Sequence, residues 1–268
     1  MGDRVRCHSG SRAKRASPES ITTNWDYGFR PSPLLRLGRN DRAWCARVIG
    51  LLLAALLLSS HAFAQPRPAS FVDARTVVPN LEVEMRYAGA NNFVGTPIDG
   101  YEDSICLLTR QAAAALAEVA RDIAAQGLAL KVFDCYRPMR AVAHFVRWAR
   151  KPADNARKKD FYPDVDKRNL FRDGYISTTS GHSRGSTVDV TLVRLDDKSE
   201  LDMGTPFDFF SPRASPLDRS VSAQAQANRA LLGSAMRRRG FVRYVKEWWH
   251  FTLRTEPFPG RYFDFPVR

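Results

Sequence analysis

Residues 180–195 read SGHSRGSTVDVTLVRL, and they combine a turn with a strand. The second half, 187–195, alternates β-branched and apolar residues in the manner of a buried strand. Seven positions separate His182 from Asp189, an odd step that would place them on opposite faces of one continuous strand. Gly185 lets the chain turn between them. We therefore expect His182 in a loop and Asp189 in the strand, with both side chains able to reach one ion.

The flanking sequence predicts further strands and helices without regular βαβ alternation. This favours an α+β single domain with a central, largely antiparallel sheet flanked by helices. Thr109 is a suitable N-cap for the clearest helix, which Gly127 ends. The expected strands are 71–87, 128–134, 187–195, 241–245 and 250–253; the expected helices are 109–126, 138–148 and 221–239; segment 151–174 is expected to be a surface excursion that covers a site, not a packed element.

A second cluster, Glu247-Trp248-Trp249-His250, places a carboxylate three residues before a histidine. Two imidazoles and one carboxylate, from His182, His250 and Asp189, suit one Zn²⁺ with its fourth position open, as a catalytic site requires. Glu247 would then deprotonate the water in that position. Arg137, at a strand-to-helix turn, would stabilise an oxyanion.

Each of these signals also has an ordinary structural explanation. A buried histidine beside an acid is commonly a hydrogen-bonded pair, and the two tryptophans can simply be core residues. Arg137 can be a structural arginine paired with a carboxylate. The residues alone leave these alternatives open.

The net charge of +13 does not by itself indicate nucleic-acid binding. Residues 1–64 contribute +6 of it, and the basic and acidic residues of the remaining chain are interspersed. We find no stripe of Lys and Arg interleaved with aromatic residues. A nucleic-acid partner is therefore not expected.

Residues 1–64 resemble a polar extension followed by a signal peptide. The apolar run 48–58 follows Arg42 and Arg47 and precedes the small-x-small site that ends at Ala64. Eleven apolar residues are short of the roughly 20 that span a bilayer, although an uncleaved anchor is the alternative. We expect cleavage after Ala64, a linker at 65–70, a catalytic domain at 71–268, export to the periplasm and no stable membrane span after processing.

Cys106 and Cys135 are the two cysteines that would remain after processing. No C-x-x-C motif is present, and in an oxidising compartment such a pair is a candidate disulfide. The alternative is that both are small buried hydrophobic residues.

Several segments together resemble the VanX-type D-alanyl-D-alanine dipeptidases, zinc peptidases of the D,D-peptidase and hedgehog-like group. The resemblance runs from about Phe71 to Arg268. It is carried by NNFVGTPIDGYE (91–102), DCYRP (134–138), SRGSTVDVTL (183–192), EWWHF (247–251) and YFDFPV (262–267). Both cysteines depart from the family's pattern, since Cys135 stands where a small residue is usual.

The resemblance implies zinc ligation by His182, Asp189 and His250. It implies that Glu247 is the general base and that Arg137 polarises the scissile carbonyl. It also implies that Tyr87, Ser180 and Asp208 bind substrate, with Asp208 facing the free amino terminus.

Three functions are compatible with these residues. The first is hydrolysis of free D-Ala-D-Ala, a small dipeptide, in cell-wall salvage or turnover. The second is a D,D-carboxypeptidase or endopeptidase acting on longer wall peptides, and the third is a zinc-stabilised binding module without catalysis. Retention of Glu247 and Arg137 argues against the third, and the sequence does not indicate an oligomeric state.

Overall fold

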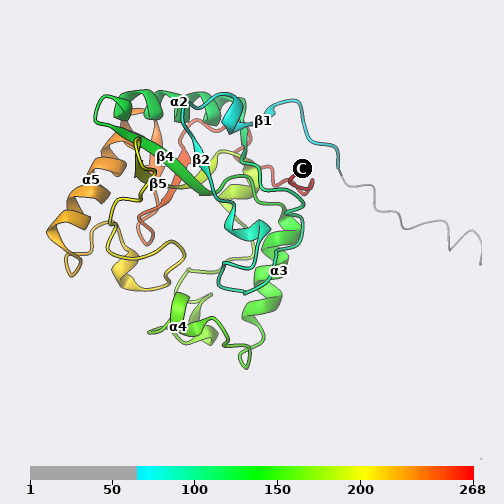
Figure 1. The fold of residues 1–268 in the computed structure, drawn as a ribbon. Coiled ribbons are helices and arrows are strands. Elements are labelled where there is room, and N and C mark those ends of the chain that lie inside the picture. The colour runs from blue at the N-terminus through cyan, green and yellow to red at the C-terminus, as the bar shows by residue number, and fades with distance from the viewer. Residues whose placement is uncertain (1–64) are drawn as a thin grey trace, which may run out of the picture. The chain divides into compact units, whose positions relative to one another are not determined.

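The computed structural model describes residues 65–268, which are built around a five-stranded sheet (Figure 1). The strand order is β2-β4-β5-β7-β6, and only the β2–β4 pair is parallel. A separate antiparallel pair joins β1 (Phe71–Asp73) to β3 (Leu107–Thr109). The strands of the large sheet are β2 (Glu82–Val83), β4 (Leu128–Asp134), β5 (Thr187–Arg194), β6 (Phe241–Arg243) and β7 (His250–Leu253). The predicted α+β class with a largely antiparallel sheet is confirmed.

The helices begin and end at the residues that sequence chemistry favours. Helix α2 (Arg110–Ala124) starts at Thr109, whose side chain accepts a hydrogen bond from the Ala112 amide. The helix buries one face of small and aliphatic residues against β4 and also contacts α5. The remaining helices are α3 (Met139–Ala149), α4 (Lys158–Phe161) and α5 (Ala223–Arg238), with short 3₁₀ turns η1 (Ala74–Thr76), η2 (Arg86–Ala88), η3 (Lys167–Asn169), η4 (Gly181–Arg184) and η5 (Pro212–Ala214).

The predicted long strand at 71–87 is wrong. Asp73 accepts a hydrogen bond from the Arg75 amide and starts a 3₁₀ turn, which ends β1 after three residues. Asn80 adopts a left-handed backbone with φ 53°, so the chain turns again before β2. Local polar side chains therefore break a segment whose apolar alternation suggested one strand.

The expectation that 151–174 is an unpacked excursion is also wrong. The segment contains α4 and η3, and it buries Phe161, Tyr162 and Leu170. The ring of Tyr162 meets that of Trp148 edge-on at 5.6 Å. Aromatic residues scattered among charges are enough to dock this segment on α3.

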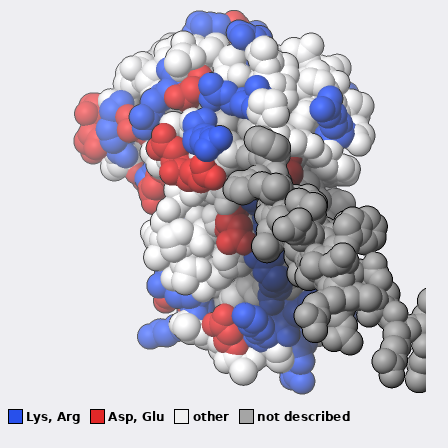
Figure 2. Space-filling view, turned by 90° about the vertical axis from the view of Figure 1, so that its right-hand side faces the viewer, with Lys and Arg blue, Asp and Glu red and all other residues white. Residues whose placement is uncertain are grey.

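Residues 1–64, with the predicted signal peptide and its cleavage site, lie outside the described residues. Across 65–268, no helix combines the length and apolar character needed to cross a bilayer. On the face shown in Figure 2, Lys and Arg are mixed with Asp and Glu in small groups.

Candidate metal centre and active site

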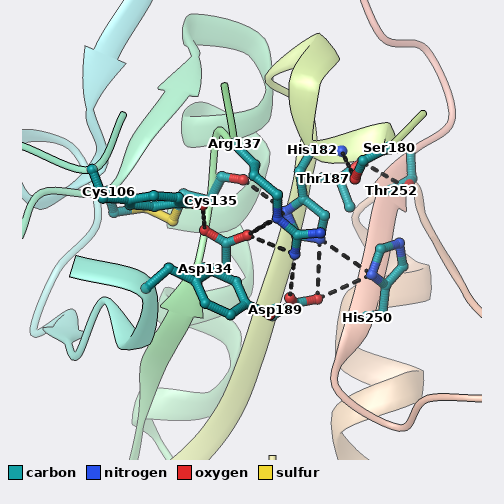
Figure 3. Close-up of polar contacts among 12 residues, drawn as sticks. Cys106, Asp134, Cys135, Arg137, Ser180, His182, Thr187, Asp189, His250 and Thr252 are labelled. Carbon is teal, nitrogen blue, oxygen red and sulfur yellow. Dashed lines mark hydrogen bonds and ion pairs between the residues drawn. A yellow bond between two sulfur atoms is a disulfide. The ribbon is translucent and has the colours of Figure 1, made fainter. Parts of the chain in front are cut away.

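The site is built on one row of residues that crosses the three central strands. In the sheet register Asp134 of β4 pairs with Asp189 of β5, and Asp189 pairs with His250 of β7. Cross-strand partners lie about 4.5–5.5 Å apart, so three polar side chains from distant segments are brought together at one end of the sheet. Figure 3 shows them converging beside the turn that carries His182.

His182 reaches this row from the 3₁₀ turn that precedes β5. Ser180 caps the turn by accepting a hydrogen bond from the His182 amide at 3.3 Å. Gly185 ends it with a left-handed backbone, φ 79°, and a Cβ there would lie 2.1 Å from the ring of Phe71. Only glycine fits both requirements, and the resulting turn places His182 against Asp189, as the spacing predicted.

His182, Asp189 and His250 present three donor atoms to one point. The His182 Nε2 atom lies 3.2 Å from His250 Nδ1 and 3.3 Å from Asp189 Oδ1, and His250 Nδ1 lies 3.0 Å from the same oxygen. Tetrahedral zinc ligands at about 2.0–2.1 Å from the ion lie roughly 3.3–3.4 Å from one another. The spacing and the two-imidazole, one-carboxylate composition therefore fit zinc.

Asp189 is buried, and its Oδ1 atom has no hydrogen-bond partner among the described residues. Burial by itself raises the pKa of this carboxyl, but the imidazoles of His182 and His250 beside it outweigh that effect and hold the pKa well below its usual range. Asp189 is therefore ionised, as a metal ligand must be. A buried carboxylate oxygen without a donor is itself a sign that a cation belongs here.

Glu247 lies beside the donor cluster without being part of it. Its Oε2 atom is 3.7 Å from His250 Nδ1, and the residue lines the same pocket. Burial, together with the charge of Asp189, raises the pKa of Glu247 to about 8. A carboxyl group perturbed in this way at the edge of a metal site is suited to take up and return a proton.

Arg137 projects into the site from the turn between β4 and α3. Its Nε and one terminal nitrogen lie 2.9 and 2.8 Å from Asp134 Oδ2, and the guanidinium is also 3.7 Å from Asp189 Oδ2. The rings of Tyr87 and Phe145 lie about 5 Å from its guanidinium carbon. The guanidinium of Arg137 is therefore held in a fixed orientation while it still lines the pocket.

Asp134 is a functional residue that reasoning from the sequence missed. Its carboxylate is fully buried and accepts hydrogen bonds from Arg137 and from the Tyr101 hydroxyl, the latter at 2.6 Å. It also lies 3.4 Å from His182 Nδ1. The available signal was an acid three residues before Arg137 at the end of a strand, but that spacing alone does not show that the two side chains meet.

The three predicted substrate-pocket residues all line one pocket of about 250 Å³. The Tyr87 hydroxyl donates to Asp208 Oδ2 at 2.8 Å, and both residues are buried. Asp208 has a left-handed backbone, φ 59°, a conformation that is uncommon outside glycine but more frequent for Asp and Asn than for other residues. Burial and the charge of Asp189 raise its pKa well above the usual range. Ser180 lines the same pocket and caps η4, the turn that carries His182.

Cys106 and Cys135 form a disulfide with a Cα–Cα distance of 5.3 Å. Both residues are fully buried. Figure 3 shows the bridge next to Asp134, on the side of the donor cluster away from His250. The candidate disulfide is therefore present in the structure, one residue from the arginine turn.

The family model and the curated relatives that match this chain agree on one family. The peptidase M15 family model described as D-ala-D-ala dipeptidase matches residues 67–268. A D-alanyl-D-alanine dipeptidase of Enterococcus faecium is 41% identical over 72% of this chain and 95% of its own length. Proteins of the same name from Streptomyces coelicolor and Escherichia coli are 39% and 37% identical over 74% and 68% of this chain, and 97% and 83% of their own lengths.

A solved structure of a mutant vancomycin-resistance D,D-pentapeptidase, VanY, in complex with Zn(II) is also similar. It is 14% identical, with a TM-score of 0.35 over 65% of this chain and 86% of that one. The family model and the dipeptidase relatives cover nearly all of the described residues. This chain belongs to the D-Ala-D-Ala dipeptidase family of peptidase M15 and is a zinc metallopeptidase.

Proposed function

We propose that this protein hydrolyses D-Ala-D-Ala to two D-alanines, with zinc held by His182, Asp189 and His250. The observation that carries the proposal is the convergence of these three metal-binding side chains in one pocket. The same pocket also contains the separate carboxyl group of Glu247 and the guanidinium of Arg137. Zinc bound there would supply Lewis acidity, polarising the scissile carbonyl and making a water molecule more acidic. The remaining tasks fall to side chains of this chain.

Glu247 is the proposed general base. It lies next to the donor cluster but its oxygens are not among the three converging atoms, so it is free to exchange a proton. It would accept a proton from the attacking water and then give it to the nitrogen of the leaving D-alanine as the C–N bond breaks. One carboxyl group thus balances the proton transfers of both steps.

Arg137 is proposed to stabilise the negative charge that develops on the carbonyl oxygen. Asp134 fixes one edge of the guanidinium, and the aromatic rings of Tyr87 and Phe145 restrict its movement. Preorganised donors of this kind act on the transition state without reorganisation during the reaction.

The amino side of the pocket supports a free dipeptide as the substrate. The Asp208 carboxyl, which is 4% exposed, and the Tyr87 hydroxyl face the pocket and offer acceptors to an ammonium group. The pocket volume of about 250 Å³ lies below the roughly 300–1,000 Å³ of sites for drug-sized ligands. These features favour a dipeptidase over a carboxypeptidase that accepts longer peptides.

The experiment measures D-alanine released from D-Ala-D-Ala by purified protein with one zinc bound per chain. Removal of zinc by a chelator should abolish release, and zinc should restore it. Glu247→Ala should retain zinc and lose at least about 100-fold in kcat, since general base catalysis typically contributes 10²–10⁴-fold. Glu102→Ala, at an exposed carboxylate paired with Arg268, is the control that should stay active. A folded, zinc-loaded protein without D-alanine release would reject the proposal in favour of a binding module.

We further propose export to the periplasm with cleavage after Ala64. The charged region, the apolar run 48–58 and the small residues before Gln65 support a signal peptide, and the Cys106–Cys135 disulfide is compatible with an oxidising compartment. Fractionation of expressing cells and amino-terminal sequencing test this. Recovery in the periplasm with Gln65 first is expected, whereas an unprocessed cytoplasmic protein would contradict it.

A further inference from the structure

The Cys106–Cys135 disulfide joins the two sheets at the rear of the metal site. Cys106 immediately precedes β3, and Cys135 immediately follows β4. The Tyr136 amide also donates to the Leu107 carbonyl at 2.9 Å, so the covalent bridge and a backbone hydrogen bond connect the same two segments. The start of the turn that carries Arg137 is therefore anchored to β3.

The backbone of Cys135 contacts a metal ligand directly. The His182 Nδ1 atom lies 2.7 Å from the Cys135 carbonyl oxygen, to which it donates, and the ring is 1% exposed. A proton held on Nδ1 leaves the lone pair on Nε2, the atom that lies next to Asp189 and His250. The Cys135 carbonyl, which is nearer to Nδ1 than Asp134 Oδ2 at 3.4 Å, thus sets both the tautomer and the direction of the ring (Figure 3).

A second hydrogen bond joins the turn of Arg137 to the turn of His182, and here the His182 residue is the acceptor. The Arg137 amide donates to the His182 carbonyl at 3.3 Å. Any displacement of Cys135 would therefore move His182 and the turn of Arg137 together. The disulfide is the covalent member of this set of contacts.

We propose that the Cys106–Cys135 disulfide is a positioning element of the zinc site, which holds the Cys135 carbonyl against His182 and thereby maintains zinc affinity. The inference rests on the proposed zinc ligation. Groups that orient a metal-bound imidazole typically contribute 10–100-fold to metal affinity. A disulfide that served only to stabilise the fold would lower the melting temperature when removed and leave zinc affinity unchanged.

The first test is the zinc dissociation constant of Cys106→Ala/Cys135→Ala, measured by competition with a chromophoric chelator well below the melting temperature. We expect the constant to rise about 10-fold or more. Ile123→Ala is the matched control, because it creates a cavity in the core face of α2 without touching the pocket. It should lower the melting temperature and leave the zinc constant unchanged. Equal zinc constants in wild type and the double variant would overturn the proposal, as would an equal loss in the control.

The second test keeps both sulfur atoms in place. Wild-type protein is reduced in denaturant, freed of reductant and refolded without oxygen, and thiol titration confirms two free thiols. The zinc dissociation constant of the reduced protein should exceed that of the oxidised protein several-fold and return to the original value on reoxidation. No difference between the two forms would refute the positioning role even if the double variant fails to fold.

Both tests measure metal affinity without substrate. Tight zinc binding that depends on the disulfide, in a protein that releases no D-alanine, would reject the proposed reaction and leave this inference standing. Disulfide-independent zinc binding in an active dipeptidase would do the reverse.

Discussion

Asp134 contacts both the guanidinium of Arg137 and the imidazole of His182. It anchors Arg137 through two contacts and lies 3.4 Å from His182 Nδ1, although it is not one of the converging donors. Its carboxylate is fully buried, which raises its pKa, and the positive charge of Arg137 opposes that rise. The buried pair therefore holds the Arg137 guanidinium in place beside the ring of His182.

We expect Asp134→Asn to lower kcat about 100-fold with KM changed little. The amide keeps the size of the side chain but loses the charge that fixes Arg137, and a small misplacement of a catalytic group costs on this order. Steady-state kinetics with zinc analysis measure the effect, and the protein should still hold one zinc. Asp264→Asn removes the half-exposed partner of Arg140 and is the control. An unchanged kcat in Asp134→Asn would show that Arg137 needs no anchor.

Gly185 and Gly127 allow backbone strain to be distinguished from steric overlap of an added side chain. Both have a left-handed backbone, but a Cβ on Gly185 would enter the ring of Phe71, whereas nothing lies within 4 Å of one on Gly127. Gly127→Ala should lower the free energy of unfolding by about 1–2 kcal/mol. Gly185→Ala should lower it by about 2–5 kcal/mol, because overpacking adds to the backbone term. Chemical denaturation measures the free energy of unfolding of both variants. An equal loss in the two variants would contradict the expected order.

The three converging residues could be proposed from the sequence because the family resemblance selects metal ligation from the alternatives that their local patterns leave open. His182 and Asp189 flank a glycine turn before a strand, and Glu247 precedes His250 by three residues. Asp134 could not be assigned this way. Its role depends on contacts with Tyr101 and His182, which are 33 and 48 positions away, and no spacing in the sequence reports them.

At the scale of elements, local signals predicted most boundaries. The structure gives β4 and β7 the expected ranges 128–134 and 250–253, because glycine or turn residues bound both. The segment 71–87 does not form the single strand that its apolar alternation predicts, because the hydrogen bond to Asp73 and the turn at Asn80 interrupt it. The packing of segment 151–174 could not be predicted from its own residues, because burial of its aromatic side chains depends on contacts with other parts of the chain.

Two helix caps provide a prediction at this scale. Thr109 caps α2 and also shares a hydrogen bond with the buried Ser186 hydroxyl at 2.8 Å, whereas Ser222 caps α5 near the surface. Ser222→Ala should cost about 1 kcal/mol of unfolding free energy. Thr109→Ala should cost about 1–3 kcal/mol more, because Ser186 loses a partner inside the core. Equal losses on thermal or chemical unfolding would show that the Ser186 contact contributes nothing.

At the scale of the whole molecule, sheet topology creates the site. The order β4-β5-β7 places Asp134, Asp189 and His250 in one row, although they are separated in sequence by 55 and 61 positions. A shift of one residue in either register would turn a ligand to the other face. Strand order and register are non-local, so the sequence predicted which residues matter but not the row that unites them.

A pocket that takes a free dipeptide is tested best by comparing kcat/KM for D-Ala-D-Ala with that for a pentapeptide ending in D-Ala-D-Ala. The buried Asp208 carboxyl leaves an acceptor without its ammonium partner when the amino side is acylated. We expect the dipeptide to be preferred by roughly 100-fold or more. Equal or faster hydrolysis of the pentapeptide would contradict it and identify a carboxypeptidase on the same zinc site.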